Sequence, residues 1–208
     1  LSQEPKGSPH RFIEEDKLTD VAQAFADYAD MKSPYTAGHS RRVAEVSQRI
    51  ARRLSLPEPQ VITIYRAALM HDIGIVAVPS FVLNKPQDQL TAAEWEQVRL
   101  HPYHSERILS KVPALKAVIP IVAAHHERMD GQGYPRGLPG TQIPSEAQII
   151  AVADRFYELS HDQPNHRAFE PNEAIRVMRQ EVGSQLAGDA FQSLFEDLSG
   201  VSPPSRQR

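Results

Sequence analysis

The chain has 208 residues, a formal net charge of −3 at pH 7 and no cysteine. This charge gives no general attraction for nucleic acid or for an acidic membrane surface, and the lack of cysteine excludes disulfides and thiolate metal ligands. No apolar run in the sequence approaches the ~20 residues that span a bilayer. We therefore expect a globular protein of the cytoplasm, with no membrane partner and no direct nucleic-acid partner.

Both ends of the chain are polar and rich in turn-forming residues. Residues 1–17 contain Pro and Gly and predict a tail or linker, and residues 201–208 read VSPPSRQR and predict a second tail. This leaves one domain over 18–200. Because the sequence begins at Leu1, we expect a fragment of a longer protein with sensory or output domains, and a homodimer is also possible.

The first half of the domain shows helical spacing of apolar residues. It predicts helices over 19–31, 37–54 and 57–74, followed by an extended or looped segment over 75–86. In the first helix we expect Thr19 as the N-cap and Val21, Phe25 and Tyr28 as the apolar stripe. In the second, His39 stands four residues before Val43 and shares its inward face.

The second half continues the helical pattern. Thr91 and Glu94 form a predicted capping box for a helix that reaches His101. Further helices are expected over 102–111, 112–127, 144–161, 171–182 and 189–198, with Pro120 as a kink or a start within 112–127 and a glycine-rich loop over 128–143. The sequence thus predicts an all-α bundle of about seven to nine helices.

Histidines and aspartates recur at the inward faces or ends of separate predicted helices. A single such histidine is more often an ordinary core residue than a ligand, but an unpaired carboxylate on a buried face costs several kcal/mol and requires a cation. Imidazole and carboxylate groups are ligands that borderline divalent metals accept. The candidates are His39, His71, Asp72, His101, His125, His126 and Asp154.

The order of these residues resembles the HD-GYP subgroup of the HD superfamily of metal-dependent phosphohydrolases. The resemblance covers about residues 34–157 and rests on TAGHSRRV, AALMHDIG, LHPYHSERIL, HHERMDGQGYP and IIAVADRFYEL. Members of the subgroup hydrolyse the bacterial second messenger cyclic di-GMP. An HD pair alone is a weak signal, whereas its combination with HHExxDGxGYP is specific.

The resemblance implies a helical fold around two divalent metals, with iron or manganese expected and zinc, nickel or magnesium as alternatives. By analogy His39, His71, Asp72 and Asp154 hold the first metal, and Asp72, His101, His125 and His126 hold the second. Asp72 is then the bridge, and His71, Asp72 and Asp154 are the residues assigned to catalysis. A water or hydroxide between the metals is the implied nucleophile.

The loop after His126 is expected to form the rim of the substrate pocket. Tyr134 could stack on a base or donate to a phosphate, although it could equally just pack the loop. Arg136 and Arg167 are the expected phosphate partners. From outside the ligand set, Glu127 and Asp130 are expected to support the site, with Glu127 orienting a ligating histidine.

Some positions depart from the usual pattern of the subgroup. Tyr35 replaces a glutamate of three-metal members, which favours two metals. Ile75 replaces a lysine, Tyr157 replaces an aspartate, and Gln163 stands in a segment that is usually basic. The predicted function is hydrolysis of cyclic di-GMP to the linear dinucleotide or GMP. The alternatives are a weak or inactive module that regulates by binding a nucleotide or partner, and a phosphohydrolase of another nucleotide.

Overall fold

The computed structural model describes residues 14–201, and those residues contain helices and two isolated β-bridges but no strand. The all-α prediction is confirmed. The helices are α1 (Leu18–Asp30), α2 (His39–Arg53), α3 (Glu58–Met70), α4 (Ser80–Leu83), α5 (Ala92–Arg99), α6 (His101–Leu109), α7 (Ile119–Val122), α8 (Ser145–Ser160), α9 (Pro171–Glu181) and α10 (Gly188–Leu198). Short 3-10 turns are η1 (Glu15–Lys17), η2 (Pro34–Thr36), η3 (Ile73–Ala77), η4 (Gln87–Gln89), η5 (Pro113–Leu115) and η6 (Gly140–Gln142).

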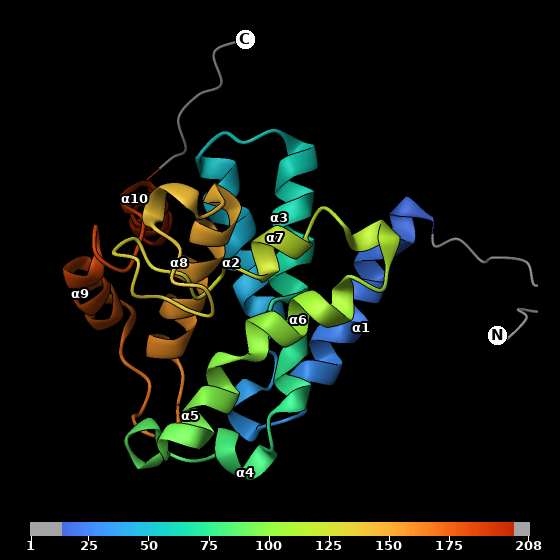
Figure 1. Ribbon diagram of the computed structural model, residues 1–208. Helices are drawn as coiled ribbons and strands as arrows, with labels where there is room; N and C mark the ends of the chain where they lie inside the picture. The colour runs from blue at the N-terminus through green and yellow to red at the C-terminus, as the bar shows by residue number, and fades with distance from the viewer. Residues whose placement is uncertain (1–13, 202–208) are drawn as a thin grey trace, which may run out of the picture.

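The core lies where α2 packs between α3 and α8, with α1 against α3 and α10 against α2 (Figure 1). Val43, Ile50, Ile64 and Ile150 are fully buried there. Val43 and Ile50 are seven residues apart on α2, which is about two helical turns, as the amphipathic pattern predicts. The central helices therefore form a rigid base for the side chains at their ends.

Helix α1 presents a different face to the core from the predicted one. Its buried side chains include Ala22, Ala26 and Ala29, whereas Tyr28 is 58% exposed. Of the predicted apolar stripe, Phe25 packs against the core, but the prediction was wrong for Tyr28, because small side chains allow α1 and α3 to approach closely. The predicted cap was also wrong, since α1 begins at Leu18 and the Thr19 hydroxyl instead accepts a hydrogen bond from Arg66.

Two segments differ from their predicted forms. The helix expected over 112–127 is replaced by η5, the four-residue α7 and a run of turns through His126. Pro113 and Pro120 each lack a backbone N–H and stand at the starts of η5 and α7, which divides the segment. At the N-terminus, η1 lies inside the expected tail, and Glu15 forms an ion pair with Arg66. Residues 1–13 and 202–208 of the two predicted tails lie outside the described residues.

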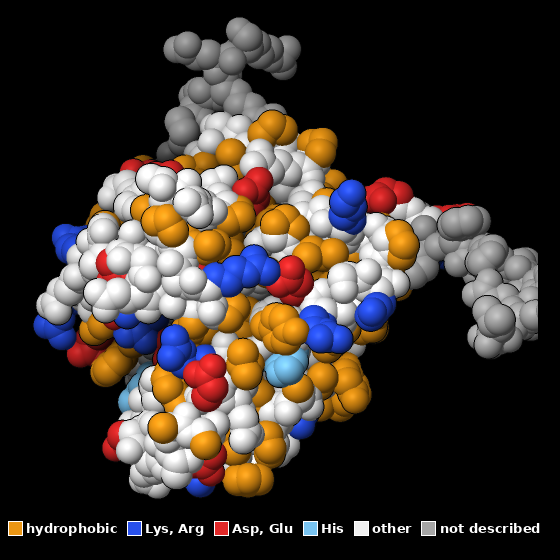
Figure 2. Space-filling view, in the orientation of Figure 1, with side chains coloured by type: hydrophobic (Ala, Val, Ile, Leu, Met, Phe, Trp, Pro, Cys, Tyr) orange, Lys and Arg blue, Asp and Glu red, His pale blue; other side chains and the backbone are white. Residues whose placement is uncertain are grey.

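The surface carries interspersed charges. Figure 2 shows basic and acidic side chains mixed over one face, with no continuous patch of either sign in that view. Among the described residues, no helix combines the length and the apolar character that a membrane crossing requires.

Candidate metal centre

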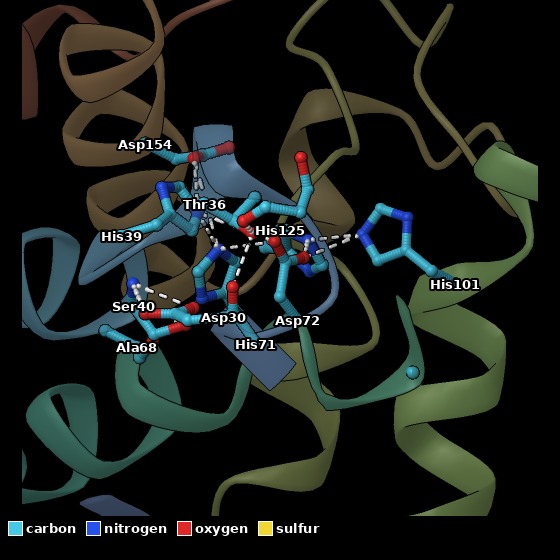
Figure 3. A network of polar contacts seen from close by, with 12 residues as sticks. Asp30, Thr36, His39, Ser40, Ala68, His71, Asp72, His101, His125 and Asp154 are labelled. Atoms are coloured by element: carbon cyan, nitrogen blue, oxygen red, sulfur yellow. Dashed lines mark hydrogen bonds and ion pairs between the residues drawn. The ribbon is translucent and has the colours of Figure 1, made fainter. Parts of the chain in front are cut away.

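Histidine and aspartate side chains from distant parts of the chain converge at one end of the central helices (Figure 3). Their positions follow from the helix ends. His39 is the first residue of α2, His71 follows the last residue of α3, His101 begins α6 and Asp154 lies within α8. The structure brings together all seven residues that the sequence proposed as ligands, namely His39, His71, Asp72, His101, His125, His126 and Asp154.

The first half of the cluster lies around His39 and His71. Their Nε2 atoms are 3.1 Å apart. Oδ2 of Asp72 lies 3.4 Å from Nε2 of His39 and 3.6 Å from Nε2 of His71. Oδ1 of Asp154 borders the same group, at 3.4 Å and 3.9 Å from these two nitrogens. Two nitrogens and two carboxylate oxygens thus face one small volume.

The second half uses the other oxygen of Asp72. Its Oδ1 lies 3.0 Å from Nε2 of His101 and 3.6 Å from Nε2 of His125, and these two nitrogens are 3.1 Å apart. A ligand atom of His126 completes a set of four that lie within 4.8 Å of one another. Asp72 therefore belongs to both halves, with one oxygen directed to each.

Backbone carbonyls fix the orientation of three of these rings. Nδ1 lies 2.7 Å from the carbonyl oxygen three residues earlier in His71, His101 and His125 alike. A carbonyl can only accept, so Nδ1 carries the hydrogen, and Nε2 of each neutral ring presents its lone pair to the centre. Such an outer hydrogen bond is the usual support of a metal-ligating histidine.

This arrangement leaves a cluster of hydrogen-bond acceptors that a cation would satisfy. With neutral rings, His101 and His125 place two lone pairs 3.1 Å apart and beside a carboxylate oxygen. That oxygen, Oδ1 of Asp72, is buried and has no hydrogen-bond partner within the described part of the chain. An unsatisfied buried carboxylate is costly unless it coordinates a metal or pairs with a charge. The residues present therefore suit a divalent metal.

The pKa values of two histidines in the cluster also indicate that the site favours positive charge. Burial lowers the pKa of His71 to about 4, so this ring is neutral at pH 7. Burial also acts to lower the pKa of His39, but its hydrogen bond to Asp72 and the charges of Asp154 and Asp72 outweigh it and raise that pKa to about 9. A proton on His39 thus supplies charge to the two carboxylates.

A close backbone approach sets the distance between Asp72 and His101. Gly74 packs so tightly against α6 that a Cβ atom there would lie 2.1 Å from the carbonyl oxygen of His101. The hydroxyl of Ser105 accepts from the Gly74 N–H and donates to the carbonyl of His71, each at 2.8 Å. Gly74 and Ser105 therefore join η3 to α6 beside the metal ligands.

The N-terminus of α2 is fixed by Asp30 at the end of α1. Its buried carboxylate accepts from the backbone N–H and the hydroxyl of Ser40, at 3.1 Å and 2.7 Å. Gly38 precedes the helix with φ +73°, a left-handed conformation that favours glycine. These contacts hold the first turn of α2 and place His39 over the cluster.

The cluster lies in a cavity of about 490 Å³, a volume typical of small-molecule sites. The basic side chains that line it are Lys85, Arg128 and Arg155. Arg136 and Arg167, the predicted phosphate partners, are not in this lining, and Arg136 instead forms an ion pair with Glu106. The three cations of the lining also have carboxylate partners, which are Glu94 for Lys85, Asp130 for Arg128, and Glu158 and Glu181 for Arg155.

Glu127 and Asp130 stabilise the loop rather than a ligand. The buried carboxylate of Glu127 accepts from the backbone N–H groups of Arg136 and Leu138, both at 2.8 Å. Asp130 accepts from the N–H of Gln132 and pairs with Arg128. Among the described residues, the hydrogen bonds of Glu127 go to this loop, and its role in orienting a histidine stays a prediction.

The residues that depart from the family pattern line the cavity. Ile75, Tyr157 and Gln163 all belong to its wall. The ring of Tyr157 meets the edge of His39 at a centroid distance of 4.6 Å and stacks on His161 at 3.8 Å. Trp95 is a further wall residue that the sequence placed on a helix without assigning it to the site. No spacing rule distinguishes it from a core aromatic residue.

Comparisons with known proteins agree with the geometry. A model of the HD domain family matches residues 23–189. The chain is 37% identical over 195 residues to the 3'3'-cGAMP-specific phosphodiesterase 3 of Vibrio cholerae, covering 94% of this chain and 42% of that protein. It is 41% identical over 145 residues to a cyclic di-GMP phosphodiesterase of Pseudomonas aeruginosa, covering 69% of this chain and 35% of that one. The chain thus spans less than half the length of these two relatives.

A solved structure, described as an HDG"Y"P protein from Bdellovibrio bacteriovorus, shares the fold. Its TM-score is 0.69 at 21% identity, with 89% of this chain and 64% of that chain covered. At this identity the likeness concerns the fold alone. Since the family model covers most of the sequence, and the motifs that carry the resemblance converge at one centre, this chain belongs to the HD domain family.

Proposed function

We propose that this chain is a metal-dependent phosphodiesterase that hydrolyses cyclic dinucleotides, with cyclic di-GMP as its substrate, in bacterial second-messenger signalling. The observation that carries the proposal is a group of three acceptor atoms, Nε2 of His101, Nε2 of His125 and Oδ1 of Asp72. This Oδ1 atom is buried and has no hydrogen-bond partner among the described residues. The names of the relatives from V. cholerae and P. aeruginosa support the substrate class.

His39, His71, Asp72 and Asp154 would hold one cation, and Asp72, His101, His125 and His126 a second. When bound, two divalent cations supply an activated water and positive charge beside the phosphate oxygens. The chain's own residues keep the histidine lone pairs directed inward through the carbonyls of Ala68, Val98 and Val122. Iron or manganese is the metal that the family resemblance favours, and a set of nitrogen and oxygen ligands suits either ion.

The test is to load the purified chain with Mn²⁺ or Fe²⁺ and to follow cyclic di-GMP and its products by chromatography. We expect conversion to the linear dinucleotide or GMP, and a loss of at least about 100-fold for His71→Ala, since one ligand of a coupled centre is removed. His104→Ala is the matched control, because His104 lies outside the cluster and the cavity lining. No product from wild type, or equal activity in His71→Ala, would contradict the proposal.

A second candidate is 3'3'-cGAMP as the preferred substrate. It is favoured by the relative that matches nearly the whole chain. Parallel measurements of kcat/KM on both dinucleotides distinguish the two substrates.

A third candidate is a module that binds nucleotide without turnover. It is favoured by the apolar Ile75 in the cavity wall and by the basic side chains of the lining, which are already paired with carboxylates. Tight binding without product under every metal would favour it.

A further inference from the structure

We propose that the indole of Trp95 is the platform on which one nucleobase of the substrate stacks. The inference rests on the proposed function, because it takes the ligand of the cavity to be a cyclic dinucleotide. It adds a base subsite at a residue of α5, beside the metal centre. The chemical class recognised is a purine ring joined through its ribose to the reacting phosphate.

A row of rings leads from the metal ligands to Trp95. The ring of His126 lies 4.7 Å from that of Tyr134, and Tyr134 lies 6.3 Å from Trp95, all measured between centroids. All three residues line the same cavity. A phosphate held at the ligands would thus have its base near the outer end of this row.

Tyr134 is poorly placed to stack on a base itself. The ring of His126 lies over it at an interplanar angle of 30°, and the guanidinium carbon of Arg99 lies 5.4 Å from its centroid. Tyr134 thus already has an aromatic partner and a cationic partner close to its ring. Tyr134 therefore lies between His126 and Trp95 and is not the ring on which we expect the base to stack.

Trp95 has no comparable partner. Within the described residues its one aromatic contact is with Tyr134, at an interplanar angle of 74°, so at most one indole face is covered by a ring. The side chain is half-buried and is not among the apolar groups packed on the hydrophobic core. An indole in a cavity wall, free of the core, offers a large flat surface to a ligand.

Polar contacts fix the N-terminal turn of α5, while Val98 near its C-terminal end packs against the hydrophobic core. No residue of α5 is buried. Its N-terminus is fixed by a capping box between Thr91 and Glu94, and Nζ of Lys85 lies 2.5 Å from Oε1 of Glu94. Trp95 is the next residue, so its backbone is fixed before any ligand binds. A pre-positioned platform reduces the entropy that binding must overcome.

Stacking depends on the π face that every base has and reads little of its edge. We therefore expect Trp95 to strengthen binding of cyclic di-GMP and of 3'3'-cGAMP to similar extents. Discrimination between guanine and adenine must come from other wall residues. This separates the role of Trp95 from the choice of substrate.

The first experiment uses fluorescence, because Trp95 is the only tryptophan in the chain. Manganese-loaded protein is titrated with the bis-phosphorothioate analogue of cyclic di-GMP, which resists hydrolysis. We expect saturable quenching of the emission at concentrations that inhibit turnover. Emission that stays constant while turnover is inhibited would overturn the proposal.

The second experiment compares Trp95→Leu with Trp95→Phe. We expect Trp95→Leu to raise KM for cyclic di-GMP by about tenfold or more, with a much smaller change in kcat, and Trp95→Phe to recover most of the loss. The effect on methyl 4-nitrophenyl phosphate, which lacks a purine, should be far smaller. Phe81→Leu on the neighbouring α4 is the control, since Phe81 is 65% exposed and outside the cavity lining.

An unchanged KM in Trp95→Leu, or an equal loss on both substrates, would overturn the stacking role while leaving the proposed function intact. Failure of the proposed function looks different. In that case the wild-type chain neither hydrolyses cyclic di-GMP nor is inhibited by the analogue.

Discussion

Glu127 shows how one buried carboxylate can organise a loop. It binds two backbone N–H groups, those of Arg136 and Leu138, across the turn that contains Gly133. A Cβ atom at Gly133 would lie 2.4 Å from Cα of Glu127, so the loop lies directly against this residue. The carboxylate thus replaces the regular backbone partners that a loop lacks.

We expect Glu127→Gln to destabilise the protein by about 2 kcal/mol, because an amide keeps one acceptor and turns an NH₂ group towards a backbone N–H. Urea unfolding measures the change. The bound metal per chain should stay the same, since the carboxylate contacts no ligand. A loss of metal with unchanged stability would instead favour the role of orienting a histidine.

Glu96→Gln is the matched control for this substitution. The side chain of Glu96 is 59% exposed, and its partner Arg99 lies 3.9 Å away. A surface pair of this kind contributes little, so we expect a change below about 0.5 kcal/mol.

At the scale of single residues, the sequence predicted the metal ligands but not which basic side chains line the cavity. His71 and Asp72 were recognisable because a buried acid beside a histidine needs a specific partner. Arg136 and Arg167 lie outside the cavity lining, and their role as phosphate partners stays a prediction, because the direction of a long exposed side chain depends on its neighbours. Arg136 forms an ion pair with Glu106 instead, and no motif in the sequence predicts that contact.

At the scale of the elements, the close packing of η3 against α6 depends on Gly74. A side chain at this position would meet the backbone of His101 and Ser105 at 2.1 Å and 2.4 Å, and backbone cannot move aside as a flexible side chain can. The junction therefore fixes both the stability of the bundle and the spacing of two ligands.

We expect Gly74→Ala to cost about 3 kcal/mol of stability and to reduce the bound metal, because α6 must shift and carry His101 away from Asp72. Thermal unfolding and elemental analysis provide the two measurements. In Gly188→Ala the nearest atom is a side-chain carbon 3.6 Å away, and we expect little change. Equal stability and metal content in both variants would show that the junction is not needed.

Helix α5 offers a test by pH. The hydrogen bond from Lys85, with further bonds from Thr91, lowers the pKa of Glu94 to about 2, below its ordinary value of 4.5. A lowered pKa means that the stabilisation is present above about pH 4.5 and is lost as the pH falls towards 2. Wild type and Glu94→Gln should therefore differ in unfolding free energy near neutral pH and converge in acid. A difference that is independent of pH would contradict this.

The elements were predicted well where packing and periodicity agreed, as in α2, α3 and α8. The prediction failed over 112–127, where apolar periodicity continued through Pro113 and Pro120 although the backbone could not. It also failed for α1, whose alanines are buried while Tyr28 is exposed. The periodicity of a sequence shows which residues are apolar, but where two helices pack closely the small residues are the ones that lie in the contact.

For the whole molecule, metal and stability should be linked. A cation that binds only the folded chain stabilises it by about 2.7 kcal/mol at a free concentration of 100 times its Kd. For a chain of this size that corresponds to roughly 5 to 10 °C in Tm. We expect chelation by EDTA to lower the Tm by this amount and Mn²⁺ to restore it.

Asp72→Ala is the informative comparison, because Asp72 belongs to both halves of the cluster. Its Tm should no longer respond to EDTA or Mn²⁺. A wild-type Tm that is equally insensitive would argue against metal binding by the folded chain.

The three carbonyls behind His71, His101 and His125 have an electrostatic consequence. They belong to the last turns of α3, α5 and the short α7, so each carbonyl adds a partial negative charge, and Asp72 and Asp154 add full charges at the same point. The potential at the floor of the cavity is therefore negative until cations arrive, and it repels an anionic phosphodiester. We therefore expect the cations to bind first and the proposed dinucleotide to bind after them.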